Sequence, residues 1–109
     1  MTTSGFFETA EARFHDWKYD HPRILYALAR SLKPKVIVEV GSYLGYCASY
    51  LARALQENNS GKLYCIDNWS LTEHVERYGN PRAHFEANLA ACGVRDWVEV
   101  VEGNSDEVV

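Results

Sequence analysis

Cysteines are few in this sequence, and clustered basic residues are missing. The 109 residues include three cysteines, none in a CxxC pair, so we do not expect a metal site. Each lies in an apolar pattern, which predicts buried free thiols in a reducing cytoplasm. These cysteines are Cys47, Cys65 and Cys92. No Lys/Arg cluster accompanies the net charge of −4, which argues against a nucleic-acid partner.

Long apolar runs are also missing. No stretch reaches the length of a transmembrane helix, so we expect no membrane partner. The first residues, MTTSGFFETAEARF, lack the basic and apolar regions of a secretory signal, and we therefore predict a cytoplasmic protein. A composition of 47% apolar and 24% charged residues is typical of one folded globular domain.

Apolar spacing predicts two helices followed by alternating strands and helices. The helices are expected over residues 6–17, 22–32, 46–56 and 81–92, and the strands over 36–40, 63–67 and 98–101. Residues 1–33 therefore form an N-terminal helical segment. Alternating strands and helices predict an α/β fold with a parallel sheet, in the doubly wound strand order 3-2-1.

Several finer expectations follow from the same patterns. The second helix should turn Ile24, Leu25, Leu28 and Leu32 toward the core, and His21 should lie before it because it precedes a proline. The strand VIVEV should be covered on both faces. Residues 68–80 are expected to form a long connection, either a lid over a substrate or a surface loop.

The turn GSYLG follows the first strand and contains Gly41 and Gly45. Alone, this glycine pair is compatible with a tight strand-to-helix turn and nothing more. Glu39 is the one charge inside VIVEV, and a buried acid needs a partner such as a turn amide or a ligand ammonium group.

Polar residues follow the next two strands. Asp67 ends the second strand, where a carboxylate can accept hydrogen bonds from both ribose hydroxyls of a nucleoside. Asn104 follows the third strand and can pair with the polar edge of an adenine. Ser105 either adds to that contact or caps a following helix, and both alternatives stay open.

The stretches EVGSYLGYCA, YCIDNW and GVRDWVEVVEGNSDE resemble successive motifs of class I S-adenosylmethionine-dependent methyltransferases. Within that group, residues 24–109 most resemble small-molecule O-methyltransferases related to catechol O-methyltransferase. The resemblance implies the N-terminal half of a doubly wound, Rossmann-like methyltransferase fold. Residues 34–109 would be a partial domain that binds S-adenosylmethionine as its cofactor.

The resemblance also implies a role for each matching residue. The backbone from Gly41 to Gly45 would lie beside the methionine part of the cofactor, lined by Ser42 and Tyr43, with Glu39 near the amino group. Asp67, in place of the glutamate often found in the catechol branch, would accept from the ribose. The adenine would be contacted by Asn68 or Trp69 and, at its edge, by Asn104 and Ser105. Tyr19 and His21 are further candidates on the substrate side.

Seven strands form the sheet in that family, and this sequence contains the first three. The family's metal ligands and general base lie in the later part, so no catalytic residue and no metal ligand is carried over. We expect these residues to be the N-terminal part of a longer protein. The first strand would be an apolar sheet edge, which predicts a homodimer or a segment-swapped assembly of the isolated chain.

The leading hypothesis is therefore the cofactor-binding part of an enzyme that transfers a methyl group to an oxygen or nitrogen of a small molecule. The isolated chain should be inactive. One alternative is a non-catalytic methyltransferase-like module for binding or assembly. Another is an NAD-dependent oxidoreductase, but Tyr43 and Tyr46 stand where its G-x-G-x-x-G fingerprint needs glycine.

Overall fold

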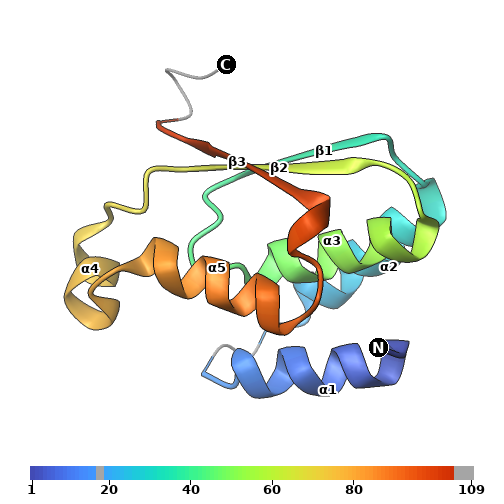
Figure 1. The fold of residues 1–109 in the computed structure, drawn as a ribbon, viewed down its shortest axis with the longest axis horizontal. Coiled ribbons are helices and arrows are strands. Elements are labelled where there is room, and N and C mark those ends of the chain that lie inside the picture. The colour runs from blue at the N-terminus through green and yellow to red at the C-terminus, as the bar shows by residue number, and fades with distance from the viewer. Residues whose placement is uncertain (17–18, 105–109) are drawn as a thin grey trace.

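Three parallel strands and a set of helices make up the computed structural model, which describes residues 1–16 and 19–104. Figure 1 shows the elements in chain order. They are α1 (Thr3–Arg13), α2 (His21–Leu32), β1 (Val36–Val40), α3 (Tyr46–Asn58), β2 (Lys62–Asp67), α4 (Thr72–Tyr78), α5 (Pro81–Ala91), the short 3₁₀ helix η1 (Arg95–Trp97) and β3 (Val98–Glu102).

The sheet has the order β1-β2-β3, which is the predicted 3-2-1 arrangement. Both pairings are parallel, with Val38 opposite Tyr64 and Tyr64 opposite Glu99. In Figure 1, helices α2, α3 and α5 lie on one side of this sheet, and α1 lies beyond them. The predicted α/β class and the first-strand edge are therefore confirmed.

The core lies between the sheet and helices α3 and α5. The predicted inward residues of α3 are buried, namely Leu51, Ala52, Ala54 and Leu55. On α5 the predicted core residues Phe85 and Leu89 are buried completely. Asn80 caps that helix, because its side chain accepts from the amide of Ala83. All three cysteines are free, and Cys65 and Cys92 are buried while Cys47 is half-buried.

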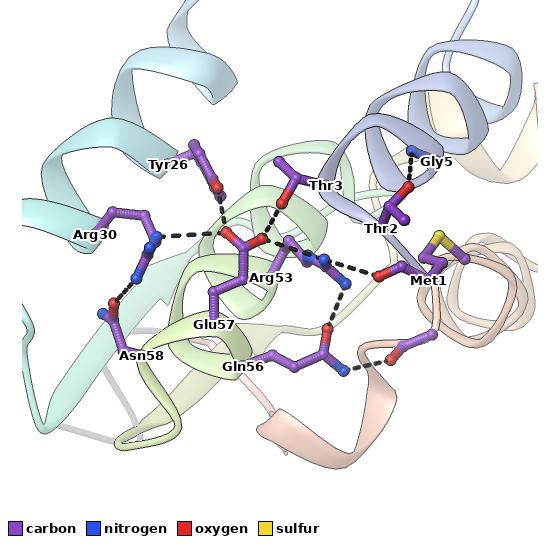
Figure 2. A network of polar contacts seen from close by, with 11 residues as sticks. Met1, Thr2, Thr3, Gly5, Tyr26, Arg30, Arg53, Gln56, Glu57 and Asn58 are labelled. Carbon is purple, nitrogen blue, oxygen red and sulfur yellow. Dashed lines mark hydrogen bonds and ion pairs between the residues drawn. The ribbon is translucent and has the colours of Figure 1, made fainter.

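A network of polar contacts joins the N-terminal helices to α3 (Figure 2). Glu57 of α3 accepts hydrogen bonds from Thr3 of α1 and Tyr26 of α2. Arg30 of α2 lies 3.4 Å from the same carboxylate, measured from Nε to Oε1. Arg53 donates to the Met1 carbonyl at 3.0 Å. The helical segment is thus attached to the first helix of the α/β unit by charged groups.

Helix α2 turns its apolar stripe outward, so the predicted orientation is wrong. Ile24, Leu28 and Leu32 are 57%, 51% and 74% exposed. Ala29 is buried and Leu25 packs at the margin of the core. The face of α2 that packs inward is formed by Pro22, Tyr26 and Ala29 instead, and Arg23 and Arg30 pair at its margin with Glu11 of α1 and Glu57 of α3.

His21 begins α2 instead of preceding it, which corrects the prediction from the proline that follows. Pro22 is the second helical residue, and the first turn of a helix tolerates proline because its N–H groups have no intrahelical partner. Helix α1 begins earlier and ends earlier than predicted, with Thr2 as its cap. Trp17, expected at its end, lies outside the described residues.

Strand β1 is not covered on both faces, contrary to the prediction. Val36, Val38 and Val40 are 59%, 56% and 59% exposed, since the helices pack on the opposite face of the sheet. The exposed apolar residues form two groups, the valines of β1 and the outward stripe of α2, and we call the two groups together the uncovered apolar surface. Its members are Ile24, Leu28, Leu32, Val36, Val38 and Val40.

Residues 68–80 contain helix α4, where a connection without a helix was expected. Its first turn closes with the amides of His74 and Val75 donating to the Leu71 carbonyl, at 2.9 Å and 3.0 Å. Gly79, with a φ of 72°, ends it. No helix in the described part of the chain is long and apolar enough to cross a membrane.

Candidate functional site

The turn between β1 and α3 is shaped by its two glycines. Gly41 and Gly45 have φ values of 80° and 90°, which favour glycine. A Cβ atom on Gly45 would lie 3.2 Å from Phe85 Cδ2, so α5 packs directly beneath the turn. The Gly41 amide donates to the Ile66 carbonyl at 2.9 Å, which ties the turn to the end of β2.

Asp67 holds the turn and the loop after β2 together. Its Oδ2 accepts from the Tyr43 amide at 2.9 Å, and its Oδ1 accepts from the Trp69 amide at 2.8 Å. Both donors belong to residues with positive φ, 50° for Tyr43 and 51° for Trp69. Each carboxylate oxygen can accept a further hydrogen bond, so the predicted ribose contact remains open to it.

Trp69 packs inward, beneath the turn. Its indole is buried, lies 5.0 Å from the Phe85 ring between centroids, and donates from Nε1 to the Tyr43 carbonyl at 2.6 Å. Of the two residues predicted to contact adenine, Asn68 is exposed and Trp69 is turned inward. The indole bond ties Trp69 to the turn at Tyr43.

A wide hollow of about 400 Å³ opens over the ends of β1, β2 and β3. Gly41 and Tyr43 of the turn line it, together with Asp67, Asn68 and Asn104 at the ends of β2 and β3. Asn68 Nδ2 donates to Asn104 Oδ1, so the two amides face each other across the strand ends. The other lining residues are Val40, Ile66, Ser70, Leu71, Thr72 and Gly103.

A smaller hollow of about 160 Å³ lies on the other side of the same turn. Glu39 and Ser42 are its polar side chains from the strand end and the turn. Its other lining residues are Tyr19, His21, Gly41, Tyr43, Leu44, Tyr46 and Cys47. The two hollows share Gly41 and Tyr43, so a ligand crossing the turn could occupy both.

Glu39 is the buried acid of the smaller hollow. Burial raises its pKa from 4.5 to about 6, and the nearby charge of Asp67 adds to this, whereas Ser42 and Cys65 oppose it. Cys65 Sγ donates to Glu39 Oε1 at 3.8 Å. Burial and the Glu39 charge also raise the pKa of the Cys47 thiol to about 11, so that thiol is neutral at physiological pH.

Ser42 has an unsatisfied hydroxyl. It is 4% exposed, and its Oγ makes no hydrogen bond of ordinary geometry among the described residues, although the hydroxyl lies near enough to the Glu39 carboxylate and the Cys65 thiol to lower the pKa of both. A buried polar atom without a partner costs free energy, and a polar ligand group in the hollow would remove that cost.

The structure brings most of the predicted site residues together at the two hollows. Around the wide one lie Gly41, Tyr43, Asp67, Asn68 and Asn104, and around the small one lie Glu39, Gly41, Ser42 and Tyr43. Gly45 and Trp69 instead shape the turn from beneath. Ser105 lies outside the described residues. No cluster of three metal-ligating side chains occurs among residues 1–16 and 19–104.

Sequence reasoning missed several lining residues. Tyr46 and Cys47 begin α3 directly after Gly45, and the first turn of a helix after such a glycine turn faces the strand ends, so their position was a usable signal. Leu71 and Thr72 line the wide hollow from the start of α4. They were missed because that helix itself was not predicted.

Comparison with known proteins agrees with this geometry. A family model described as a methyltransferase domain matches residues 38–109. A comparison with curated protein sequences found no significant match. Among solved structures, the O-methyltransferase TomG from Streptomyces achromogenes, in complex with S-adenosylmethionine, superposes with a TM-score of 0.67 at 24% identity. That match covers 99% of this chain and 46% of TomG.

Two further structures are similar. A Bacillus cereus O-methyltransferase in complex with S-adenosylhomocysteine has a TM-score of 0.65 at 21% identity, covering 98% of this chain and 46% of its own. A Geobacter sulfurreducens methyltransferase has a TM-score of 0.61 at 24% identity. That match covers 95% of this chain and 50% of the Geobacter chain. The chain thus spans about half the length of these structures. It belongs to the methyltransferase-domain family, which confirms the resemblance to class I methyltransferases.

Proposed function

We propose that this chain binds S-adenosylmethionine and forms the cofactor-binding part of an enzyme that methylates a small molecule on oxygen or nitrogen. The observation that carries the proposal is the pair of hollows meeting at one glycine turn, each with a single carboxylate from the end of a strand. Asp67 belongs to the wide hollow and Glu39 to the small one. This division suits a ligand with a nucleoside at one end and a cationic group at the other.

The wide hollow suits the adenosine half. Ribose hydroxyls are donors, and the Asp67 carboxylate has acceptor capacity left after its two amide contacts. Asn68 and Asn104 lie at the same edge and offer amide donors and acceptors to a purine. Leu71 contributes apolar surface against which a flat base can pack.

The small hollow suits the amino-acid half. An ammonium group beside Glu39 would offset the burial that now raises the pKa of that carboxyl, and would favour its ionised form. The Ser42 hydroxyl would gain a partner. Bound in this way, S-adenosylmethionine supplies an electrophilic methyl group on sulfur. This chain would bind and orient that group, and positioning alone can lower a barrier by roughly 7–11 kcal/mol in the best cases.

The comparisons support the choice of cofactor and acceptor. TomG is an O-methyltransferase in complex with S-adenosylmethionine, and the Bacillus cereus O-methyltransferase is in complex with S-adenosylhomocysteine. Because the chain spans about half of each, the activity of the whole enzyme is part of the proposal. We assign no catalytic residue.

Calorimetric titration of the chain with S-adenosylhomocysteine tests the proposal. We expect saturable binding that Asp67→Asn weakens tenfold or more, while Asp96→Asn, an exposed acid in η1, leaves the affinity unchanged. Absence of saturable binding by the wild-type chain would contradict the cofactor assignment.

Asp67 also holds two amides, so its loss could disturb the turn itself. The 2′-deoxy analogue of S-adenosylhomocysteine separates the two effects. If Asp67 contacts the ribose, the analogue should bind wild type weakly and Asp67→Asn about equally weakly. If Asp67→Asn bound the analogue much more weakly than wild type does, Asp67 would act on the conformation of the turn and not on the ribose.

A further inference from the structure

Tyr43 has a backbone conformation that residues other than glycine rarely adopt. Its φ is 50°, and a bulky residue in this left-handed region persists only when surrounding contacts impose it. In this conformation the Tyr43 amide donates to Asp67 Oδ2 at 2.9 Å. Tyr43 and Asp67 both line the wide hollow. A group that holds Tyr43 in the left-handed region therefore also sets where Asp67 presents its carboxylate.

Trp69 binds the carbonyl end of the same residue. Its indole Nε1 donates to the Tyr43 carbonyl at 2.6 Å, and its own amide donates to Asp67 Oδ1 at 2.8 Å. Together with the bond from the Tyr43 amide to Asp67, these contacts close a ring of three hydrogen bonds. Because Trp69 is 7% exposed, water does not readily replace the indole bond. The ring ties the turn after β1 to the loop after β2.

Helix α5 holds the indole from beneath. Phe85 is buried, and its ring centroid lies 5.0 Å from that of Trp69. The Arg82 guanidinium lies over the indole, with Cζ 5.4 Å from the ring centroid, and Arg82 Nη1 pairs with Glu102 Oε2 at 2.9 Å. Glu102 ends β3, so the support of Trp69 extends to the third strand end. The indole thus has a fixed position from which it can hold Tyr43.

A second bond from α5 acts on the next residue of the turn. The buried Asn88 side chain donates from Nδ2 to the Leu44 carbonyl at 2.8 Å, and its Oδ1 accepts from Arg13 Nε at 3.1 Å. Leu44 does not have a positive φ, whereas Tyr43 is the non-glycine residue of the turn that does. The indole bond of Trp69 is therefore the contact that acts on the strained residue.

We infer that Trp69 is a positioning residue for the cofactor. Its indole N–H holds Tyr43 in the left-handed conformation and thereby fixes the Asp67 carboxylate that is proposed to contact the ribose. The inference rests on the proposed function and adds to it the group that arranges the turn and the acid before a ligand binds. In this role Trp69 acts from beneath the turn and needs no contact with the ligand.

A double-mutant cycle tests this inference. Trp69→Phe keeps an aromatic ring against Phe85 but removes the N–H donor, and in calorimetric titrations it should weaken S-adenosylhomocysteine binding about tenfold. Glycine adopts a positive φ without steric cost, so in a chain that carries Tyr43→Gly the same Trp69→Phe change should weaken binding by no more than about twofold. Trp97→Phe is the matched control, since Trp97 is a half-buried tryptophan in η1, at the start of β3 and not at its carboxyl end.

Hydrogen exchange in the ligand-free, ¹⁵N-labelled chain gives a second readout that needs no cofactor. Trp69→Phe should speed the exchange of the Tyr43 amide about tenfold, because Tyr43 then leaves the conformation in which this amide donates to Asp67. The Ser49 amide, which donates to the Gly45 carbonyl at 2.9 Å, should keep its rate. A general loss of stability would instead speed both.

The outcomes separate this inference from the proposed function. If wild type binds S-adenosylhomocysteine and Trp69→Phe binds it as tightly as Trp97→Phe does, the positioning role is wrong and the cofactor assignment stands. An equal loss with and without Tyr43→Gly would show that the indole acts by packing alone, which also overturns the inference, as does unchanged exchange of the Tyr43 amide. If wild type does not bind S-adenosylhomocysteine, the proposed function fails and this inference fails with it.

Discussion

Glu39 is a buried acid whose ionisation costs stability. Its pKa in the folded chain is about 6, above the ordinary 4.5. The stability that this group contributes is therefore fully present below about pH 4.5 and is lost as the pH rises through about 6. Glu39→Gln removes the ionisation. The difference in the free energy of unfolding between Glu39→Gln and wild type should thus shift in favour of the variant by about 2 kcal/mol between about pH 4 and about pH 7.

Urea unfolding of both chains at the two pH values measures this difference. Glu99→Gln is the control, because Glu99 is an exposed acid on β3. A constant difference between Glu39→Gln and wild type across this range would mean that Glu39 is not held in a desolvated position.

The sequence allowed the positions of Glu39 and Asp67 to be predicted, because the carboxyl ends of parallel strands meet at one edge of a sheet. It gave no sign that Asp67 would also bind two amides of its own chain. That arrangement needs Tyr43 and Trp69 in the left-handed region, and residues other than glycine adopt this conformation only when surrounding contacts impose it. The indole bond to the Tyr43 carbonyl is such a contact, and it links residues 26 apart.

Helix α3 anchors the N-terminal helices through Glu57 (Figure 2). Burial raises the pKa of Glu57, but hydrogen bonds from Thr3, Tyr26 and Arg53 outweigh burial and lower it overall. Glu57→Gln should lower the free energy of unfolding by about 1–3 kcal/mol at neutral pH, because its donors lose a charged acceptor.

The pH dependence of Glu57→Gln has the opposite sign to that of Glu39→Gln. A lowered pKa contributes stability above the ordinary value of 4.5, and this is lost as the pH falls through the folded-state value. The amount by which the free energy of unfolding of wild type exceeds that of Glu57→Gln should therefore become smaller at acidic pH. Thermal unfolding measures it, with Glu8→Gln on the exposed side of α1 as control. If Glu57→Gln lost no more stability than Glu8→Gln, the anchoring role of Glu57 would be contradicted.

The strands and the helices α3 and α5 could be predicted from the sequence because the apolar periodicity, the capping residues and the glycines all indicate the same element boundaries there. Asn80 before Pro81 is an example. The outward stripe of α2 could not be predicted, since apolar spacing shows that a helix has an apolar face but not what covers that face. Helix α4 was missed because its 7 residues bury no side chain, so the apolar pattern is weak.

At the scale of the whole molecule, the most prominent feature is the uncovered apolar surface, which no other described part of the chain packs against. It combines the outward stripe of α2 with the valines of β1, a strand that pairs with β2 alone in the described part of the chain. Free edges and apolar faces favour association. We therefore expect the isolated chain to self-associate through β1, as its sequence predicts.

Size-exclusion chromatography with light scattering tests this association. Val38→Lys, at the centre of β1, should shift the chain toward the monomer mass. Val75→Lys should not, because Val75 is an exposed apolar residue on α4, outside the uncovered apolar surface. A wild-type chain that stays monomeric at all concentrations would contradict the prediction.

The central claim is that a cofactor lies across the glycine turn, and amide chemical shifts of the ¹⁵N-labelled chain test it most directly. On adding S-adenosylhomocysteine, the amides of Gly41, Gly45 and Gly103 should shift, since they surround or support the two hollows. Gly61, beside Pro34 and Leu55, and Gly93, after α5, should stay unchanged as internal controls. Unchanged spectra, or shifts confined to Gly61 and Gly93, would contradict the account.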